Sequence, residues 1–217
     1  MALNILVFLG SVRDSTPPKP ARLGLRVALA CERLIREAGH DVELIDPIDY
    51  ERPAIFKPAF AYGDHNRPKQ LSALQAKIEA ADGYVMVSPE YNHSMSPALA
   101  DMLNHFRSSS FSYKPSSIVT YSAGQWGGTR AAIGMRSFLS ELGCLPVSAM
   151  IHVPKAQEAL DAEGNFCENS ERWAEYFGRS FGQLRWWAEA CNAQREQESP
   201  LDTAPAFAMS PAQRNAP

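Results

Sequence analysis

Cysteine is scarce in this sequence, and the four that are present lie far apart. None belongs to a Cys-x-x-Cys pair, the spacing typical of zinc sites and dithiol redox centres. The first residues also carry no basic segment ahead of their apolar run, as a secretory signal would. We therefore expect reduced, mainly structural thiols, no metal site, and a cytoplasmic protein. The four residues are Cys31, Cys144, Cys167 and Cys191.

Long apolar runs and a strong net charge are missing as well. No segment approaches the roughly 20 apolar residues that a membrane-spanning helix needs. The net charge is only -3 and the isoelectric point about 6.0, so no basic field favours nucleic acid or an anionic membrane as a partner. The motifs GxGxxG and GxxxxGK[ST] are absent too, which removes the usual signatures of dinucleotide-binding domains and P-loop proteins. No GxSxG elbow between a strand and a helix supports a serine hydrolase either.

What remains is the composition of an ordinary globular domain. Of the 217 residues, 45% are hydrophobic and 21% charged, and a chain of this length can bury one sizeable core. We expect a single domain over residues 1–198. The Pro/Ala-rich stretch 199–217 has no periodic pattern and predicts a disordered tail.

Strand and helix patterns alternate along the chain. Short apolar runs predict strands at residues 3–9, 40–46, 84–87, 116–121 and 145–153. Apolar residues at steps of three and four predict helices over about 21–39, 68–81, 129–142 and from Ser170 onward, and another with Ser96 as N-cap and Pro97 as its first residue. Five strands alternating with five helices indicate an α/β protein, a parallel sheet with helices on both faces.

Three loops follow strands of this sheet: the first loop (residues 10–15), the second loop (89–94) and the third loop (122–128). Because the carboxyl ends of parallel strands meet at one edge, one ligand could contact all three. The first loop offers hydroxyls, backbone N–H groups and Arg13, which suit a phosphate. A plain strand-to-helix turn with a solvated arginine explains it equally well. Without a dinucleotide fingerprint, a monophosphate fits better than a pyrophosphate.

The second and third loops hold aromatic rings and amides. Tyr91 and Trp126, with Asn92, Gln125 and several glycines, could enclose a flat heteroaromatic ring and meet its polar edge. Each aromatic could instead be structural. Their shared position on carboxyl-end loops favours the ligand.

Three stretches resemble one protein family: GSVR, SPEYNHSMSPALADMLNHF and YSAGQWGGTRA. Over residues 3–153 the chain resembles the NADPH-dependent FMN reductase family, flavodoxin-like flavoproteins that include quinone, azo-dye and chromate reductases. The resemblance implies a doubly wound sheet of strand order 2-1-3-4-5, FMN as cofactor, NADPH as co-substrate, and a homodimer or homotetramer. A long aperiodic segment, 47–67, and the adjacent Trp186 and Trp187 also favour a subunit contact.

The same resemblance assigns site residues by position. It implies that FMN carries the chemistry at its N5 atom and that no side chain is catalytic, so His93 and His105 would have contact or structural roles. The phosphate would lie against Ser11, Arg13 and Ser15; the isoalloxazine would lie along Pro89, Glu90, Tyr91 and Asn92; and its other side would meet Ser122, Gly124, Gly127 and Gly128.

The sequence departs from the family at a proline-rich insertion, residues 16–20, directly after the first loop. Alternatives to the family's activity therefore stay open. The preferred hypothesis is an FMN-dependent oxidoreductase that takes hydride from NADPH and passes electrons to flavin, quinone, azo compound or metal chelate. One alternative is a flavodoxin-type electron carrier or flavin-binding module without nicotinamide turnover. Another is a relative of this fold that has lost flavin and serves as a structural or regulatory subunit, which the proline-rich insertion keeps open.

Overall fold

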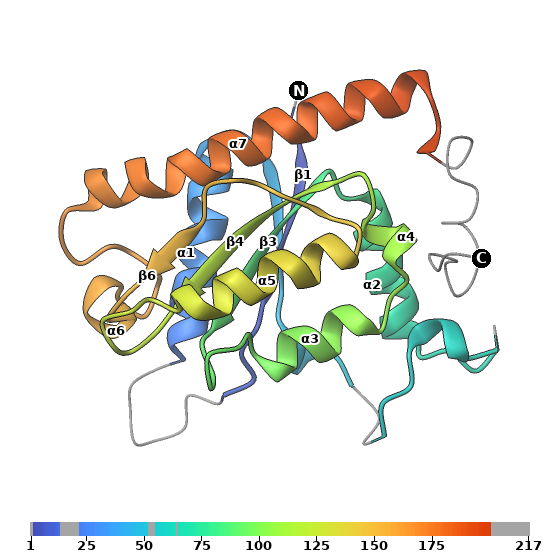
Figure 1. The fold of residues 1–217 in the computed structure, drawn as a ribbon, viewed down its shortest axis with the longest axis horizontal. Coiled ribbons are helices and arrows are strands. Elements are labelled where there is room, and N and C mark those ends of the chain that lie inside the picture. The colour runs from blue at the N-terminus through green and yellow to red at the C-terminus, as the bar shows by residue number, and fades with distance from the viewer. Residues whose placement is uncertain (1, 14–21, 52–54, 64, 201–217) are drawn as a thin grey trace.

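The computed structural model describes residues 2–13, 22–51, 55–63 and 65–200, and its centre is a twisted parallel sheet (Figure 1). Strands β2, β1, β3, β4 and β5 follow one another across the sheet, and β6 also pairs with β4. This order confirms the expected 2-1-3-4-5 arrangement. The strands are β1 (Asn4–Leu9), β2 (Asp41–Ile45), β3 (Gly83–Pro89), β4 (Pro115–Tyr121), β5 (Leu145–Pro146) and β6 (Ile151–Val153).

The predicted continuous fifth strand, 145–153, is wrong. The structure divides it into β5, which pairs with the start of β4, and β6, which pairs with the end of β4. Between them, Ala149 N donates to Gln183 Oε1 at 2.9 Å, and Ser180 Oγ donates to the Ala149 carbonyl at 2.8 Å. These two side chains of the last helix therefore satisfy the backbone that a continuous strand would have paired with β4.

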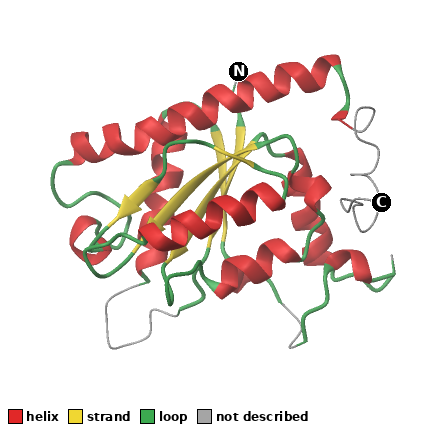
Figure 2. Cartoon of the chain, viewed as in Figure 1, coloured by secondary structure: helices red, strands yellow, loops and turns green. Residues whose placement is uncertain are grey.

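Helices cover both faces of the sheet, as expected (Figure 2). Side chains of β1 alternate between the two faces: Leu6 and Phe8 join one core, while Ile5, Val7 and Leu9 join the other. Helices α1 (Leu23–Glu37), α6 (Ala156–Ala159) and α7 (Ser170–Gln197) pack on one face. The other face carries α2 (Lys69–Ala80), α3 (Pro97–Asn104), α4 (Ser108–Phe111) and α5 (Thr129–Glu141), and segment 47–67 contains the short turns η1 (Pro47–Asp49) and η2 (Ala59–Ala61).

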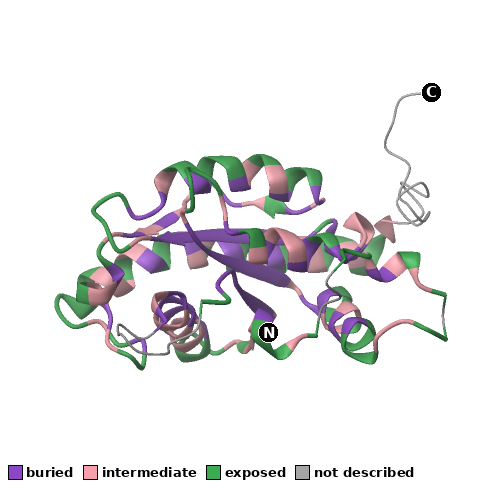
Figure 3. Ribbon diagram, turned by 90° about the horizontal axis from the view of Figure 1, so that it is seen from below, coloured by how far each residue is buried: buried purple, intermediate pink, exposed green. Residues whose placement is uncertain are grey.

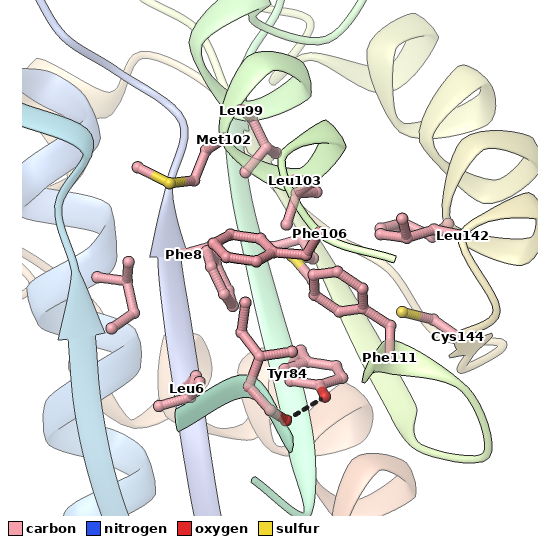
Figure 4. Close-up of a cluster of buried hydrophobic side chains, with 14 of the residues drawn as sticks. Leu6, Phe8, Tyr84, Leu99, Met102, Leu103, Phe106, Phe111, Leu142 and Cys144 are labelled. Atoms are coloured by element: carbon pink, nitrogen blue, oxygen red, sulfur yellow. Dashed lines mark hydrogen bonds between the residues drawn. The ribbon is translucent and has the colours of Figure 1, made fainter. Parts of the chain in front are cut away.

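The middle strands are buried along their whole length, since every residue of β3 and β4 is shielded from solvent (Figure 3). In the core on the α3 and α5 face, Tyr84 meets Phe8 and Phe111 edge to face, with ring centroids 6.2 and 5.4 Å apart, while Phe8 and Phe111 are tilted at 6.5 Å (Figure 4). The Tyr84 hydroxyl donates to the Ile78 carbonyl at 2.8 Å. That bond compensates for burying a polar group in this cluster.

The four cysteines, all within the described residues, are not paired with one another in disulfides. No helix in the described ranges is long and apolar enough to cross a membrane. The proline-rich insertion, Ser15 and the tail from residue 201 lie outside the described residues.

Candidate active site

The carboxyl ends of β1, β3 and β4 lie at one edge of the sheet, beside α6 and the amino end of α5 (Figure 1). Strand β1 ends against β3, where Gly10 N donates to the Val87 carbonyl at 2.7 Å. A Cβ on Gly10 would lie 2.6 Å from that oxygen. Only glycine therefore lets the first loop leave the sheet so close to β3.

The described part of the first loop is anchored by Ser11 and exposes its next two residues. Ser11 is only 3% exposed, and its carbonyl accepts from the buried guanidinium of Arg22, which also pairs with both carboxylate oxygens of Asp46. Val12 and Arg13 project to solvent. The loop thus has a rigid base and an exposed cation, the donor set that a phosphate monoester requires.

Tyr121, the last residue of β4, contacts the first loop. Its hydroxyl is hydrogen-bonded to the Ser11 side chain and interacts electrostatically with Tyr91, Arg22 and Arg13. Burial raises the pKa of the Tyr121 hydroxyl, and the Ser11 hydrogen bond opposes that rise. Tyr121 is therefore a neutral phenol that binds the first loop, while its backbone pairs with Pro89 at the start of the second loop.

The second loop is a tight hairpin. Tyr91 and Ser94 exchange backbone hydrogen bonds of 3.0 and 2.9 Å, and the two residues between them, Asn92 and His93, have φ angles of 51° and 62°. Two positive φ angles in a two-residue turn are characteristic of type I′, which suits Asn better than most residues. The hairpin projects the Tyr91 ring, 40% exposed, and the Asn92 amide beyond the sheet edge.

The start of α3 holds the base of this hairpin. Ser88 Oγ accepts from Ser96 N at 2.9 Å and donates to the Pro89 carbonyl at 2.8 Å. Ser96 Oγ then accepts from Ala98 N at 3.1 Å, which confirms the predicted N-cap. Pro89 is buried at the end of β3, so a ligand could contact its backbone but not its ring. The exposed residues that follow it are the ones available to a ligand.

The third loop folds around the Ser122 hydroxyl, which accepts from Gly127 N at 2.9 Å and donates to the Gly124 carbonyl at 2.8 Å. Gly127 and Gly128 are buried with φ of 61° and 80° and pack against His152 and Thr120, so the turn itself requires glycine there. Gly124 differs, because a Cβ at that position would meet open space. Of the three glycines, Gly124 has the freest approach to a ligand.

Glu90 joins the second loop to α5. Its carboxylate accepts from Arg130 N and Ala131 N at 3.0 and 3.3 Å and pairs with the Arg130 guanidinium at 2.9 Å. That guanidinium also lies 5.8 Å from the ring centroid of Trp126, which is 61% exposed on the third loop.

The described residues thus bring the three loops together at one edge. The chemistry of their exposed groups suits FMN: a cation and backbone donors for the phosphate, two aromatic rings and an amide for the isoalloxazine. Tyr121, Arg22 and Arg130 were not identified from the sequence as site residues. Their partners are distant in the chain, and no local pattern marks them.

The comparisons with known proteins agree with this geometry. A family model described as NADPH-dependent FMN reductase matches residues 3–158. The chain belongs to that family. The expected family and its flavodoxin-like sheet are therefore confirmed, and the family description itself names FMN and NADPH.

Individual members of the NADPH-dependent FMN reductase family and related structures are more distant. An NAD(P)H-dependent FMN reductase from Pseudomonas aeruginosa is 31% identical over 124 residues, which cover 55% of this chain and 66% of that protein. The FerB flavoenzyme from Paracoccus denitrificans, an NAD(P)H:(acceptor) oxidoreductase, gives a TM-score of 0.67 at 20% identity over 87% of this chain and 98% of its own. A flavodoxin from Pseudomonas aeruginosa gives 0.51 at 15% identity over 83% of this chain and 99% of its own. These two structures establish the fold alone.

The chain spans between 46% and 66% of the length of three curated relatives that it matches. None of the comparisons tests the individual site residues. Their roles toward the flavin therefore stay predictions.

Proposed function

We propose that the protein is an FMN-dependent oxidoreductase that uses NADPH and delivers electrons to a second small acceptor such as a flavin, quinone, azo compound or metal chelate. The observation that carries the proposal is Tyr121, whose hydroxyl is hydrogen-bonded to Ser11 of the first loop and whose backbone pairs with Pro89, where the second loop begins. A loop suited to phosphate and an aromatic hairpin thus begin beside the same residue, which supports one shared ligand at the sheet edge where α/β proteins bind ligands.

Each group of residues has a distinct part in this proposal. Arg13 and the backbone around Ser11 would hold the phosphate; Tyr91 and Asn92 would border the ring, and Gly124 would let the third loop approach it closely. The hydride and electron transfers are supplied by FMN when it is bound. The chain's own contribution is to fix the ring and leave one face open to NADPH and then to the acceptor. No side chain is assigned as acid or base.

We further propose a homodimer or homotetramer in the cytoplasm. Large apolar side chains are exposed on α5 and α7: Ile133 is 62%, Trp186 58% and Trp187 44% exposed. A subunit contact over such side chains would remove them from water. The free thiols suit a reducing compartment. Light scattering at micromolar concentration tests the assembly, and a monomer would contradict it.

The direct test is to purify the protein, add FMN, record the visible spectrum and follow NADPH oxidation with a quinone acceptor. We expect a yellow complex that oxidises NADPH. A protein without affinity for FMN would refute the proposal, and a tight flavin complex that NADPH never reduces would identify an electron carrier instead.

A single substitution tests the phosphate assignment. Arg13→Ala should weaken FMN binding by about 1.5 to 3 kcal/mol, the usual size of a hydrogen bond to a charged group. Arg36→Ala is a suitable control, because Arg36 is an exposed arginine in the last turn of α1, away from the first loop. Equal affinities for the two variants would place Arg13 outside the phosphate site.

A further inference from the structure

The Glu90 side chain is largely buried, although Glu90 lies in a surface loop. It directly follows β3, and its side chain is 11% exposed, whereas the next residue, Tyr91, is 40% exposed. All three of its hydrogen-bond donors belong to the first turn of α5, 40 and 41 residues further along the chain. The carboxylate is thus occupied by protein groups that belong to a different loop.

The hydrogen bonds that join Glu90 to α5, called the Glu90–α5 tie below, are strong because of where their donors lie. Arg130 N and Ala131 N lie in the first turn of a 13-residue helix, where backbone N–H groups have no partner within the helix and carry its positive dipole end. A carboxylate that accepts from two such groups and from a guanidinium makes three charge-assisted hydrogen bonds. These bonds fix the start of α5, and with it the end of the third loop, relative to the second loop.

The Glu90–α5 tie also involves Trp126, the exposed aromatic residue of the third loop. Arg130 pairs with Glu90 and places its guanidinium 5.8 Å from the ring centroid of Trp126. Removing Glu90 would leave the Arg130 side chain, 42% exposed, free to swing away from the indole.

We propose that Glu90 is a positioning residue that sets the separation of the second and third loops and orients Trp126 through Arg130. The inference rests on the proposed function, because these two loops are the ones that would hold the isoalloxazine. The Glu90 backbone still borders the ring, while the carboxylate acts through protein partners.

The chain offers a matched control at the other end of the same strand. Asp82 immediately precedes β3, and its side chain is 22% exposed. Its carboxylate accepts from Asn4 N at 2.8 Å and from Asn192 Nδ2 at 2.9 Å, so it too joins separate segments. Asp82→Ala therefore removes a comparable tie at the sheet edge opposite the candidate site.

The experiment measures FMN dissociation constants and thermal stability for Glu90→Ala, Glu90→Gln, Arg130→Met and Asp82→Ala. We expect Glu90→Ala to raise the FMN dissociation constant about tenfold or more, because it loses all three charge-assisted hydrogen bonds between the second loop and α5. Glu90→Gln should have a smaller effect, since an amide oxygen still accepts from the helix N–H groups. Arg130→Met should have the smallest, because it leaves Glu90 bound to those groups. Asp82→Ala should destabilise the fold without changing FMN affinity.

Two readouts separate positioning from general destabilisation. At saturating FMN, the visible band of the flavin in Glu90→Ala should lose resolved shoulders and approach that of free FMN, whereas in Asp82→Ala it should match the wild type. The double variant Glu90→Ala/Arg130→Met should bind FMN no more weakly than Glu90→Ala alone, because one tie cannot be broken twice.

Wild-type FMN affinity in Glu90→Ala, or an equal loss in Asp82→Ala, would overturn the inference alone. If Glu90→Ala does not fold, Glu90→Gln decides between the same outcomes. A wild-type protein that does not bind FMN would overturn the proposed function together with the inference.

Discussion

Gly24 lies in the first turn of α1, where a glycine would ordinarily weaken a helix. Here it faces the candidate site. A Cβ at this position would lie 2.3 Å from the Tyr121 hydroxyl oxygen and 3.0 Å from both Leu9 Cδ1 and Ser11 Cβ. The helix can therefore sit this close to the first loop only because residue 24 has no side chain.

The substitution Gly24→Ala sets two effects against each other. Helix propensity alone favours alanine by about 1 kcal/mol. Against this, overpacking of a well-packed contact costs about 1 to 3 kcal/mol, and loss of the Tyr121–Ser11 hydrogen bond costs about 1 kcal/mol more. We expect a net destabilisation of about 1 to 3 kcal/mol in urea denaturation. Because Ser11 must move, FMN affinity should fall as well.

Gly134 provides the matched control, since it is a helical glycine in α5 with no atom within 4 Å of an added Cβ. Gly134→Ala should stabilise the protein by about 0.5 to 1 kcal/mol and leave FMN affinity unchanged. The clash can also be relieved directly: Tyr121→Phe removes the nearest oxygen, so Gly24→Ala should cost less in that background than in the wild type. Equal stabilisation by Gly24→Ala and Gly134→Ala would refute this account of the packing.

Two further predictions concern buried polar groups. Arg22→Met removes one partner of the buried Arg22–Asp46 pair and should lower the free energy of unfolding by about 3 to 5 kcal/mol. Arg36→Met, which breaks an exposed pair with Glu32, should lower it by less than about 1 kcal/mol. Similar losses in the two variants would show that the Arg22–Asp46 pair is not a buried anchor. Burial raises the pKa of Cys144 from 9.0 to about 12, so its thiol stays protonated in the folded chain while it ionises in the unfolded chain. The free energy of unfolding should therefore fall by about 1.4 kcal/mol per pH unit from this group above pH 9, and urea denaturation of Cys144→Ala should show a shallower alkaline slope than the wild type.

The sequence predicted the elements whose information is local. The apolar runs of β1, β3 and β4 and the Ser96-Pro97 start of α3 each depend on residues within a few positions of one another, and the structure contains them. The prediction of a continuous fifth strand was wrong because the information that it needed is not local. Its break depends on Ser180 and Gln183, more than 30 residues away on α7. The short helix α4 was also missed, because four residues are too few for a helical period to show.

For the candidate site, the sequence predicted which loops would meet but did not predict how they are joined. Exposed groups such as Arg13, Tyr91 and Trp126 could be proposed from residue type and position. The bonds from Arg22 to Ser11 and from Glu90 to Arg130 could not, because each links residues from different segments whose approach depends on the whole sheet. Glu90 shows the difference: its position marks it as a loop residue, and only the structure shows that its carboxylate is bound to α5.

These ties explain how a site made of loops can be rigid. The first two loops are each fixed by a side chain from a neighbouring element: Arg22 at the start of α1 holds the first, and Ser88 in β3 holds the second. Glu90, within the second loop, then connects that loop to α5 and so to the third. Because the fixing groups are buried or nearly so, the exposed groups are left free for a ligand without loss of loop geometry. A cofactor whose phosphate and ring are held by different loops needs that constancy of spacing, since movement of one loop would weaken either contact.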